Sequence, residues 1–200
     1  MEKSKARSAV IEVAQKEFMT NGIKAVKMDN IASSLNMSKR TIYELFETKE
    51  LLLEECIVKF QKEKEKKMAS ITKAAKGDLL KVLVGTFKYQ VEIIPKVNAA
   101  FYDELSYYPN LVTKLENNNN EHDSQLLAFF HEGVKQGIFR DTINYNLIIE
   151  SFRNQLKSIV SNKLYNKYPL MDMFNSLTMV LFRGLVTEKA LQQFEKLYNT

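Results

Sequence analysis

Positions 39–44 of the chain carry five side chains that can form hydrogen bonds: Lys39, Arg40, Thr41, Tyr43 and Glu44. Ammonium and hydroxyl groups suit the phosphate oxygens of a nucleic acid, and a guanidinium can bind the O6 and N7 atoms of guanine together. A short segment with this chemistry is expected to bind a partner, and DNA is the leading candidate.

Two short helices are predicted to position this segment. Met28, Ile31, Ala32 and Leu35 recur at helical spacing, so the first helix should bury one face. Asn36 tolerates the positive φ that a helix ending needs.

The second helix should begin after Ser38, whose hydroxyl can accept a hydrogen bond from a backbone N–H of the first turn. Met37 is expected in the core before it, and Ile42, Leu45 and Phe46 are expected to face inward. Two helices joined in this way form a helix-turn-helix, in which the second helix lies in the major groove of DNA.

With its flanking helices, this region resembles the tetracycline-repressor (TetR) family of transcriptional regulators. The first quarter of the chain carries the resemblance at residue level, and the remainder matches in length and helical content. The matching residues are Ile11, Ala14, Phe18, Gly22, Met28, Ile31, Ala32, Leu35, Met37, Ser38, Thr41, Ile42, Tyr43, Phe46, Lys49, Glu50 and Leu51.

The resemblance implies an all-α chain with two domains. Residues 1–48 would form a three-helix DNA-binding domain, and residues 49–200 a helical bundle for ligand binding and dimerisation, with a connector helix over about 49–72. Lys39 and Arg40 would reach base edges, and Thr41, Tyr43 and Lys49 would hold phosphates. The residues expected at the DNA are Lys27, Ser38, Lys39, Arg40, Thr41, Tyr43, Glu44 and Lys49.

Three positions depart from the family pattern. Lys27 replaces the usual Ser or Thr cap, so the helix that follows should begin without a side-chain cap. Leu45 replaces a Tyr or His that often contacts phosphate, and Asn36 replaces a common Gly. These changes affect single contacts and not the fold.

Charge is distributed unevenly along the chain. Residues 1–76 hold 16 Lys and Arg against 11 Asp and Glu, whereas residues 77–200 hold 13 of each. Basic surface drives phosphate binding and makes it salt-dependent. The run from Lys59 to Lys76 supplies most of the surplus, and it fits either direct DNA contact or a solvated helix face interleaved with Glu63 and Glu65.

The second half reads as a series of amphipathic helices, separated at Gly77, Pro95, Pro109, Gly137 and Pro169. The sequence leaves open whether residues 117–120 form a loop or part of a helix. Segments 145–163 and 170–185 carry wide apolar stripes, which fit either a core or an interface. The resemblance implies that this pair forms a homodimer, and two half-sites would fit a palindromic operator.

The resemblance also implies a cavity for a small-molecule effector inside the bundle. The residues expected there are Phe87, Tyr89, Phe101, Tyr102, Phe130, Phe152 and Arg153. Any single aromatic of this set more often belongs to plain core than to a ligand site. Arg153 lies on a strongly apolar helix, where a charge needs a partner. Its side chain could pair with an internal carboxylate such as Glu104, bind an acidic ligand, or extend to solvent.

The sequence speaks against several other classes of protein. His122 and His131 lack the spacing of two metal ligands on one helix, and phosphate-loop and nucleophile motifs are absent. We therefore expect no enzyme activity, metal or cofactor. No apolar run reaches the roughly 18 residues of a membrane helix, and Cys56 is the single cysteine, so a packed, cytoplasmic, non-membrane protein is expected.

Two functions remain. The favoured one is a ligand-responsive, sequence-specific DNA-binding repressor. The alternative is a helical small-molecule-binding or interaction protein that no longer binds DNA specifically. The exposed set around Lys39 and Arg40 favours the first.

Overall fold

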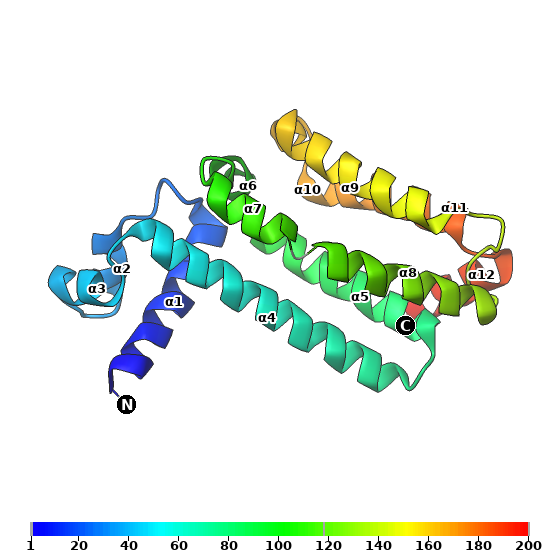
Figure 1. Cartoon of the computed structure of the whole chain (residues 1–200), viewed down its shortest axis with the longest axis horizontal. Helices are drawn as coiled ribbons and strands as arrows, with labels where there is room; N and C mark the ends of the chain where they lie inside the picture. The colour runs from blue at the N-terminus through cyan, green and yellow to red at the C-terminus, as the bar shows by residue number, and fades with distance from the viewer. Residues whose placement is uncertain (1, 118, 200) are drawn as a thin grey trace. The chain divides into compact units, whose positions relative to one another are not determined.

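The computed structural model describes residues 2–117 and 119–199 (Figure 1). Its first helices are α1 (Glu2–Asn21), α2 (Met28–Ser34), α3 (Lys39–Leu45) and α4 (Lys49–Ala75). They are followed by α5 (Leu79–Ile93), the 3₁₀ turn η1 (Ile94–Lys96), α6 (Ala99–Leu105), α7 (Pro109–Asn117) and α8 (Asn119–Lys135). The last are α9 (Tyr145–Ser161), the 3₁₀ turn η2 (Leu164–Asn166), α10 (Leu170–Met173), the π-helical turn η3 (Phe174–Thr178), α11 (Met179–Leu185) and α12 (Glu188–Tyr198).

This order of elements confirms the all-α class. Within the described ranges, paired extended backbone is limited to one isolated bridge between Phe139 and Val186. In the same part of the chain, every helix is too short or too polar to cross a membrane. Residues 117, 119 and 120 are helical, and residue 118, at the α7–α8 junction, lies outside the described residues.

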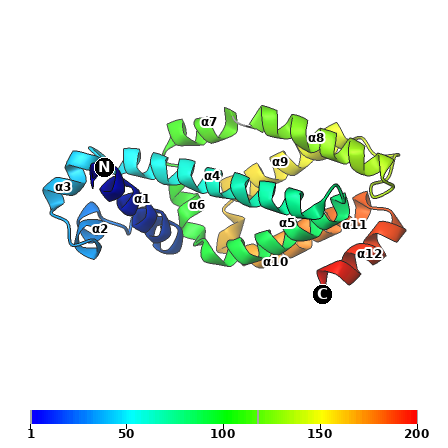
Figure 2. The same ribbon diagram turned by 90° about the horizontal axis from the view of Figure 1, so that it is seen from below.

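Contacts divide the chain into two compact units. Unit 1 comprises residues 1–67 and 96–113, and unit 2 comprises residues 68–95 and 114–200. In unit 1, α6 packs against α1 and thereby joins the N-terminal helices (Figure 2). The helix α4 contributes residues to both units.

Unit 1 has its own core, built from the apolar faces of α1 to α4. Phe18, Ile42 and Phe46 are almost completely buried there, as are Leu52 and Leu53. Cys56 belongs to this core, and burial raises the pKa of its thiol to about 12. The prediction of a packed position for Cys56 is therefore confirmed.

Unit 2 is held together by aromatic side chains. The ring of Phe87 lies 5.1 Å from that of Phe182 and 5.2 Å from that of Phe194, measured between centroids. These contacts place α12 beside α5 (Figure 2). The segment 170–185 is helical throughout, with the π-helical turn η3 in its middle.

Candidate nucleic-acid interface

The helix α3 presents its polar face to solvent because its apolar side chains are buried. Ile42 and Leu45 lie in the core of unit 1, together with Phe46 directly after the helix. Lys39 and Arg40 are consequently exposed, as are Tyr43 and Glu44, while Thr41 is half-buried. The predicted inner and outer faces of this helix are confirmed.

The turn that leads into α3 has the predicted local geometry. Asn36 adopts a φ of 52°, and the N–H of Met37 donates to the carbonyl of Ala32 at 2.9 Å. The hydroxyl of Ser38 accepts a hydrogen bond from the N–H of Thr41 at 3.0 Å, which caps the helix. Its oxygen also lies 2.8 Å from the hydroxyl of Thr41.

Lys27 stands at the beginning of α2. Its backbone is extended and its side chain makes no capping hydrogen bond, as expected where a Ser or Thr is missing. The side chain is exposed, so its ammonium is free to approach a phosphate at the N-terminus of α2, where backbone N–H groups also favour anions.

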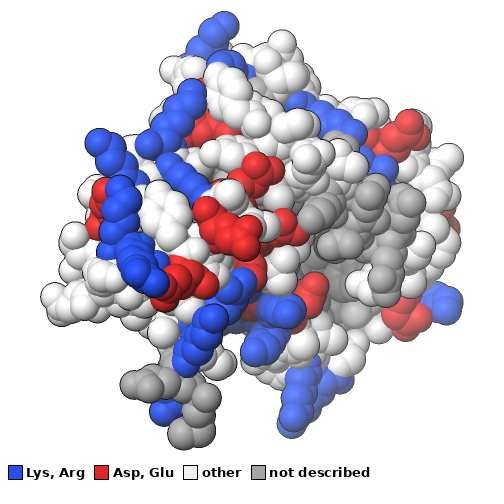
Figure 3. Space-filling view, turned by 60° about the vertical axis from the view of Figure 1, so that its left-hand side comes forward, with Lys and Arg blue, Asp and Glu red and all other residues white. Residues whose placement is uncertain are grey.

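Both cations of α3 have a carboxylate partner. The Lys39 ammonium lies 2.9 Å from Oδ2 of Asp29 in α2, and this hydrogen bond raises the pKa of Lys39. Nε of Arg40 lies 2.8 Å from Oε1 of Glu44, one turn further along α3. Exposed pairs of this kind contribute little to stability, because water screens both charges. DNA can therefore compete for both cations. Viewed from the side of α1–α3, the surface carries Lys and Arg interspersed with Asp and Glu (Figure 3).

Lys49 differs from the other residues expected at the DNA. Its ammonium donates a hydrogen bond to the carbonyl of Val26, and it lies 5.8 Å from the centroid of the Phe18 ring. Partial burial lowers the pKa of Lys49. In this structure the side chain ties the first turn of α4 to the segment before α2, because the buried carbonyl needs a donor.

Arg7 is a neighbour of α3 that the sequence analysis did not identify. Its guanidinium pairs with Glu55 of α4 and donates to the carbonyl of Leu45 at the end of α3. It also lies 4.2 Å from the centroid of the Phe46 ring. Arg7 thus fixes the C-terminal end of α3, where backbone carbonyls attract a positive charge.

A second unpredicted cluster joins α6 to the end of α1. The backbone N–H of Asn98 donates to the carbonyl of Met19 at 2.7 Å, and the side-chain amide of Asn98 donates to the carbonyl of Thr20 at 3.1 Å. Oε2 of Glu104 accepts a hydrogen bond from the N–H of Lys24 at 2.6 Å. These contacts lock the loop between α1 and α2 onto α6.

Gly22 is the residue that permits this close approach. Its φ is +85°, and a Cβ atom there would lie 3.0 Å from Oε2 of Glu104 and 3.2 Å from Cβ of Ala100. A side chain at this position would therefore meet both backbone strain and crowding.

The residues expected to bind a ligand are divided between the two units. Phe101 and Tyr102 lie in unit 1, where Phe101 packs against the core and burial raises the pKa of Tyr102. In unit 2, Phe87 and Tyr89 are buried and Phe152 is half-buried. Phe130 stacks on Tyr145 with 4.6 Å between ring centroids.

Arg153 pairs with a carboxylate, which was one of the alternatives left open by the sequence, but this carboxylate is not that of Glu104. Its guanidinium pairs with Asp123 of α8, and both side chains are about one third exposed. Glu104 is engaged with Lys24 instead. The pairing follows from the packing of α8 against α9, which brings the two side chains together.

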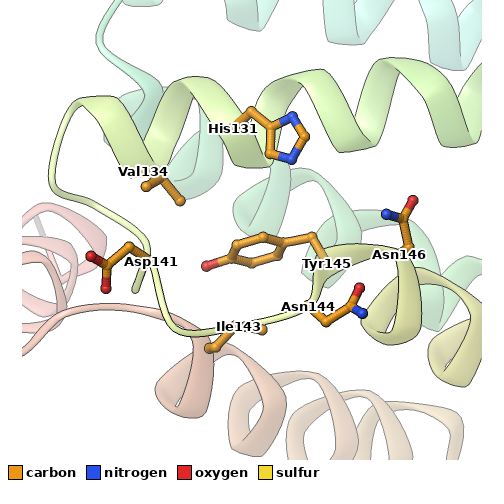
Figure 4. Close-up of a pocket in the computed structure, with 7 residues that line it drawn as sticks. All are labelled: His131, Val134, Asp141, Ile143, Asn144, Tyr145 and Asn146. Carbon is orange, nitrogen blue, oxygen red and sulfur yellow. The ribbon is translucent and has the colours of Figure 1, made fainter.

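A hollow of about 250 Å³ lies in unit 2, at the turn between α8 and α9 (Figure 4). None of the residues expected to bind a ligand lines it. Its walls are formed by His131, Val134, Asp141, Ile143, Asn144, Tyr145 and Asn146. Figure 4 shows the Tyr145 ring in the middle of these residues, with His131 above it.

Comparisons with known proteins agree with this arrangement. The sequence profile of the bacterial regulatory proteins of the tetR family matches residues 10–56, which span most of α1 to the start of α4. The chain is 26% identical over 153 residues to the HTH-type transcriptional repressor KstR2 of Mycolicibacterium smegmatis, which covers 74% of both chains.

Solved structures share the fold over almost the whole chain. A TetR-family transcriptional regulator from Agrobacterium tumefaciens superposes with a TM-score of 0.70 at 14% identity, covering 92% of this chain and 100% of that one. A transcriptional regulator from Saccharomonospora viridis in complex with choline has a TM-score of 0.64 at 18% identity, with the same coverage. The ketosteroid regulator KstR2 of Mycobacterium tuberculosis has a TM-score of 0.59 at 16% identity, covering 92% and 96%.

Proposed function

Because the chain belongs to the TetR family of bacterial transcriptional regulators, we propose that it is a homodimeric repressor that binds a palindromic operator and leaves it when a small molecule binds. The observation that carries the proposal is the exposed polar face of α3, held outward by buried Ile42 and Leu45 and capped by Ser38. A regulator that had lost its DNA site would not need this face. Its action on DNA would place it in the cytoplasm.

In the DNA complex, we propose that Arg40 and Lys39 contact base edges. A guanidinium on the first turn of a recognition helix can bind guanine O6 and N7 together, which discriminates against the other bases. Lys27, Ser38, Thr41 and Tyr43 would contact phosphates, which set the register of the protein on the duplex but carry little sequence information. Lys49 would act by holding α4 in place.

The dimer would form through α9 and the segment 170–185. Leu147 of α9 is 59% exposed and Val180 of α11 is 70% exposed, and Phe152, Leu177 and Leu181 on these helices are half-buried. Large apolar side chains gathered on a surface favour burial against a partner. A two-fold dimer would present two α3 helices to successive major grooves, about 34 Å or a multiple of it apart.

The effector is proposed to be an apolar or amphipathic small molecule that binds in unit 2, whose interior is rich in aromatic rings. It would lower DNA affinity by favouring a dimer in which the two α3 helices are wrongly spaced. The chain crosses from one unit to the other at three points, which are within α4, just before Lys96 and just after Thr113. We propose that α4, together with α6 and its contacts through Asn98 and Glu104, transmits the change.

The test is DNA binding measured on duplexes from the chain's own upstream region, over a range of salt concentrations. We expect one site to be preferred, with an affinity that falls as salt rises. Arg40→Ala should cost about 1–3 kcal/mol on that site and relax the preference at one position in each half-site.

Lys189→Ala is the matched control, because it removes an exposed cation from α12 in unit 2. It should leave site preference unchanged. If Arg40→Ala behaves like this control, α3 does not contact base edges. If the unmodified protein prefers no sequence, the alternative of a non-DNA-binding interaction protein replaces the repressor.

A further inference from the structure

The carboxylate of Asp29 lies on the surface proposed to face DNA. It belongs to the first turn of α2, and its Oδ2 atom is 2.9 Å from the Lys39 ammonium at the beginning of α3. Both side chains are exposed, at 55% for Asp29 and 65% for Lys39. The same ammonium lies 5.9 Å from the centroid of the Tyr43 ring. Asp29 and Tyr43 therefore hold the cation of Lys39 between the two helices.

A carboxylate is favourable in the first turn of α2, beside its backbone N–H groups, but stability does not explain why it pairs with Lys39. An ion pair this exposed contributes little to folding, because water screens both charges. A negative charge on this surface also repels every phosphate that approaches it, which weakens DNA binding in general. Because Asp29 lowers the affinity for DNA, its role is sought in the discrimination between DNA sequences.

We propose that Asp29 is a specificity-determining residue, which keeps Lys39 from contacting phosphates of arbitrary DNA and directs its ammonium toward a base. The proposal rests on the DNA-binding function proposed above. An ammonium has three donors, of which Asp29 takes one and leaves two in a restricted orientation. Guanine O6 and N7 are acceptors that fit such an ammonium in the major groove.

The effect on specificity follows from the source of non-specific affinity. That affinity depends on the number of phosphates neutralised by cations, and the Asp29–Lys39 pair has no net charge to contribute. On the operator, base contacts add to the phosphate contacts. Asp29 should therefore lower affinity for unrelated DNA more than affinity for the operator.

The Arg40–Glu44 pair does not have this arrangement. Both residues belong to α3 at positions i and i+4, and the Arg40 side chain is 89% exposed. A pair within one helix does not restrain the cation against a second element. The proposed role is accordingly assigned to Asp29, whose carboxylate links α2 to α3.

The experiment compares Asp29→Asn with the unmodified protein on the operator and on an unrelated duplex of equal length, across a salt series. On the unrelated duplex, affinity should rise about tenfold per dimer, and the slope of log K against log salt should become steeper by about 0.9 for each protomer. Operator affinity should change less than threefold. Asp29→Glu, which retains the charge, should behave like the unmodified protein.

Two controls separate this role from a simple change of charge. Glu12→Gln removes one exposed negative charge from α1 of the same unit, and it should raise both affinities slightly and equally. In a Lys39→Ala background, Asp29→Asn should no longer steepen the salt slope. Thermal unfolding of each variant verifies that it is folded.

The proposal is overturned if Asp29→Asn raises operator and non-specific affinity by the same factor, or if Glu12→Gln has the same effect. It is also overturned if the salt slope changes equally with and without Lys39. If the unmodified protein prefers no DNA site at all, the DNA-binding function itself is wrong, which is a different outcome from failure of the role of Asp29.

Discussion

Replacing Ser38 by Ala should destabilise the protein and weaken its operator complex, because it removes the N-terminal cap of α3. The Ser38 oxygen satisfies the N–H of Thr41 at 3.0 Å and contacts the Thr41 hydroxyl at 2.8 Å. Loss of a Ser cap costs about 0.5–2 kcal/mol. Because Ser38 is exposed and water can replace its oxygen, we expect about 1 kcal/mol, in the middle of that range.

This loss should lower Tm by about 2–4 °C for a chain of this size that unfolds cooperatively. The helix α3 has only seven residues, so fraying of its first turn also displaces Lys39 and Arg40. If binding has to restore that turn, operator affinity should fall by up to about fivefold for each protomer of the dimer, the equivalent of about 1 kcal/mol for each α3 helix.

Two further variants distinguish the cap from the DNA contact. Ser38→Asp retains a good capping group and should retain Tm, but its charge should repel phosphate and weaken DNA binding further. Thr187→Ala removes the cap of α12, where the Thr187 hydroxyl accepts from the N–H of Ala190 at 3.3 Å and also donates to the carbonyl of Gly137 at 2.9 Å. It should lower stability without changing DNA affinity.

Differential scanning calorimetry and fluorescence anisotropy with labelled operator measure the two effects. An unchanged Tm for Ser38→Ala beside a lowered Tm for Thr187→Ala would refute the capping argument. Operator binding by Ser38→Asp as tight as that of the unmodified protein would show that the beginning of α3 does not approach phosphate.

The two remaining predictions concern assembly and switching. Leu177→Arg places a charge in the proposed dimer surface and should yield monomers in sedimentation, with Lys189→Ala as the dimeric control; a folded monomer for the unmodified protein at micromolar concentration would exclude the dimer. Glu104→Ala removes the contact between α6 and the N–H of Lys24. A ligand is first found by thermal-shift screening, and calorimetry then measures its affinity with and without operator. In the unmodified protein, operator should weaken ligand binding about 5- to 150-fold. In Glu104→Ala this factor should be smaller, while ligand affinity without DNA is retained. Glu188→Ala, which removes an exposed carboxylate from α12, is the control. A coupling equal to that of this control would exclude the route through Glu104.

Local signals were sufficient to predict the helix-turn-helix. The apolar spacing of Ile31, Leu35 and Ile42 determines which faces are buried, and Asn36 and Ser38 determine where one helix ends and the next begins. Each of these signals acts within a few residues, through backbone conformation and hydrogen bonds of the same turn. The exposed set on α3 follows from them without knowledge of the remaining chain.

The sequence could not determine which groups this surface uses for its own internal contacts. Lys49 has the residue type of a phosphate ligand, yet its ammonium is held by the Val26 carbonyl, 23 residues away. Asp29 meets Lys39 only because α2 packs against α3. A charged side chain is assigned to solvent or to a partner by its neighbours in space, which sequence spacing does not reveal.

The same reason explains the placement of α6 and Arg153. Glu104 meets the N–H of Lys24 across 80 positions of the chain, and Arg153 pairs with Asp123 on a neighbouring helix. Helical periodicity predicts that each element has a buried face, but it does not say which element covers that face. The sequence alone therefore determined the helices and the polar face of α3, whereas tertiary packing decided the partners of Lys49, Asp29, Glu104 and Arg153, because those contacts join residues that only the fold brings together.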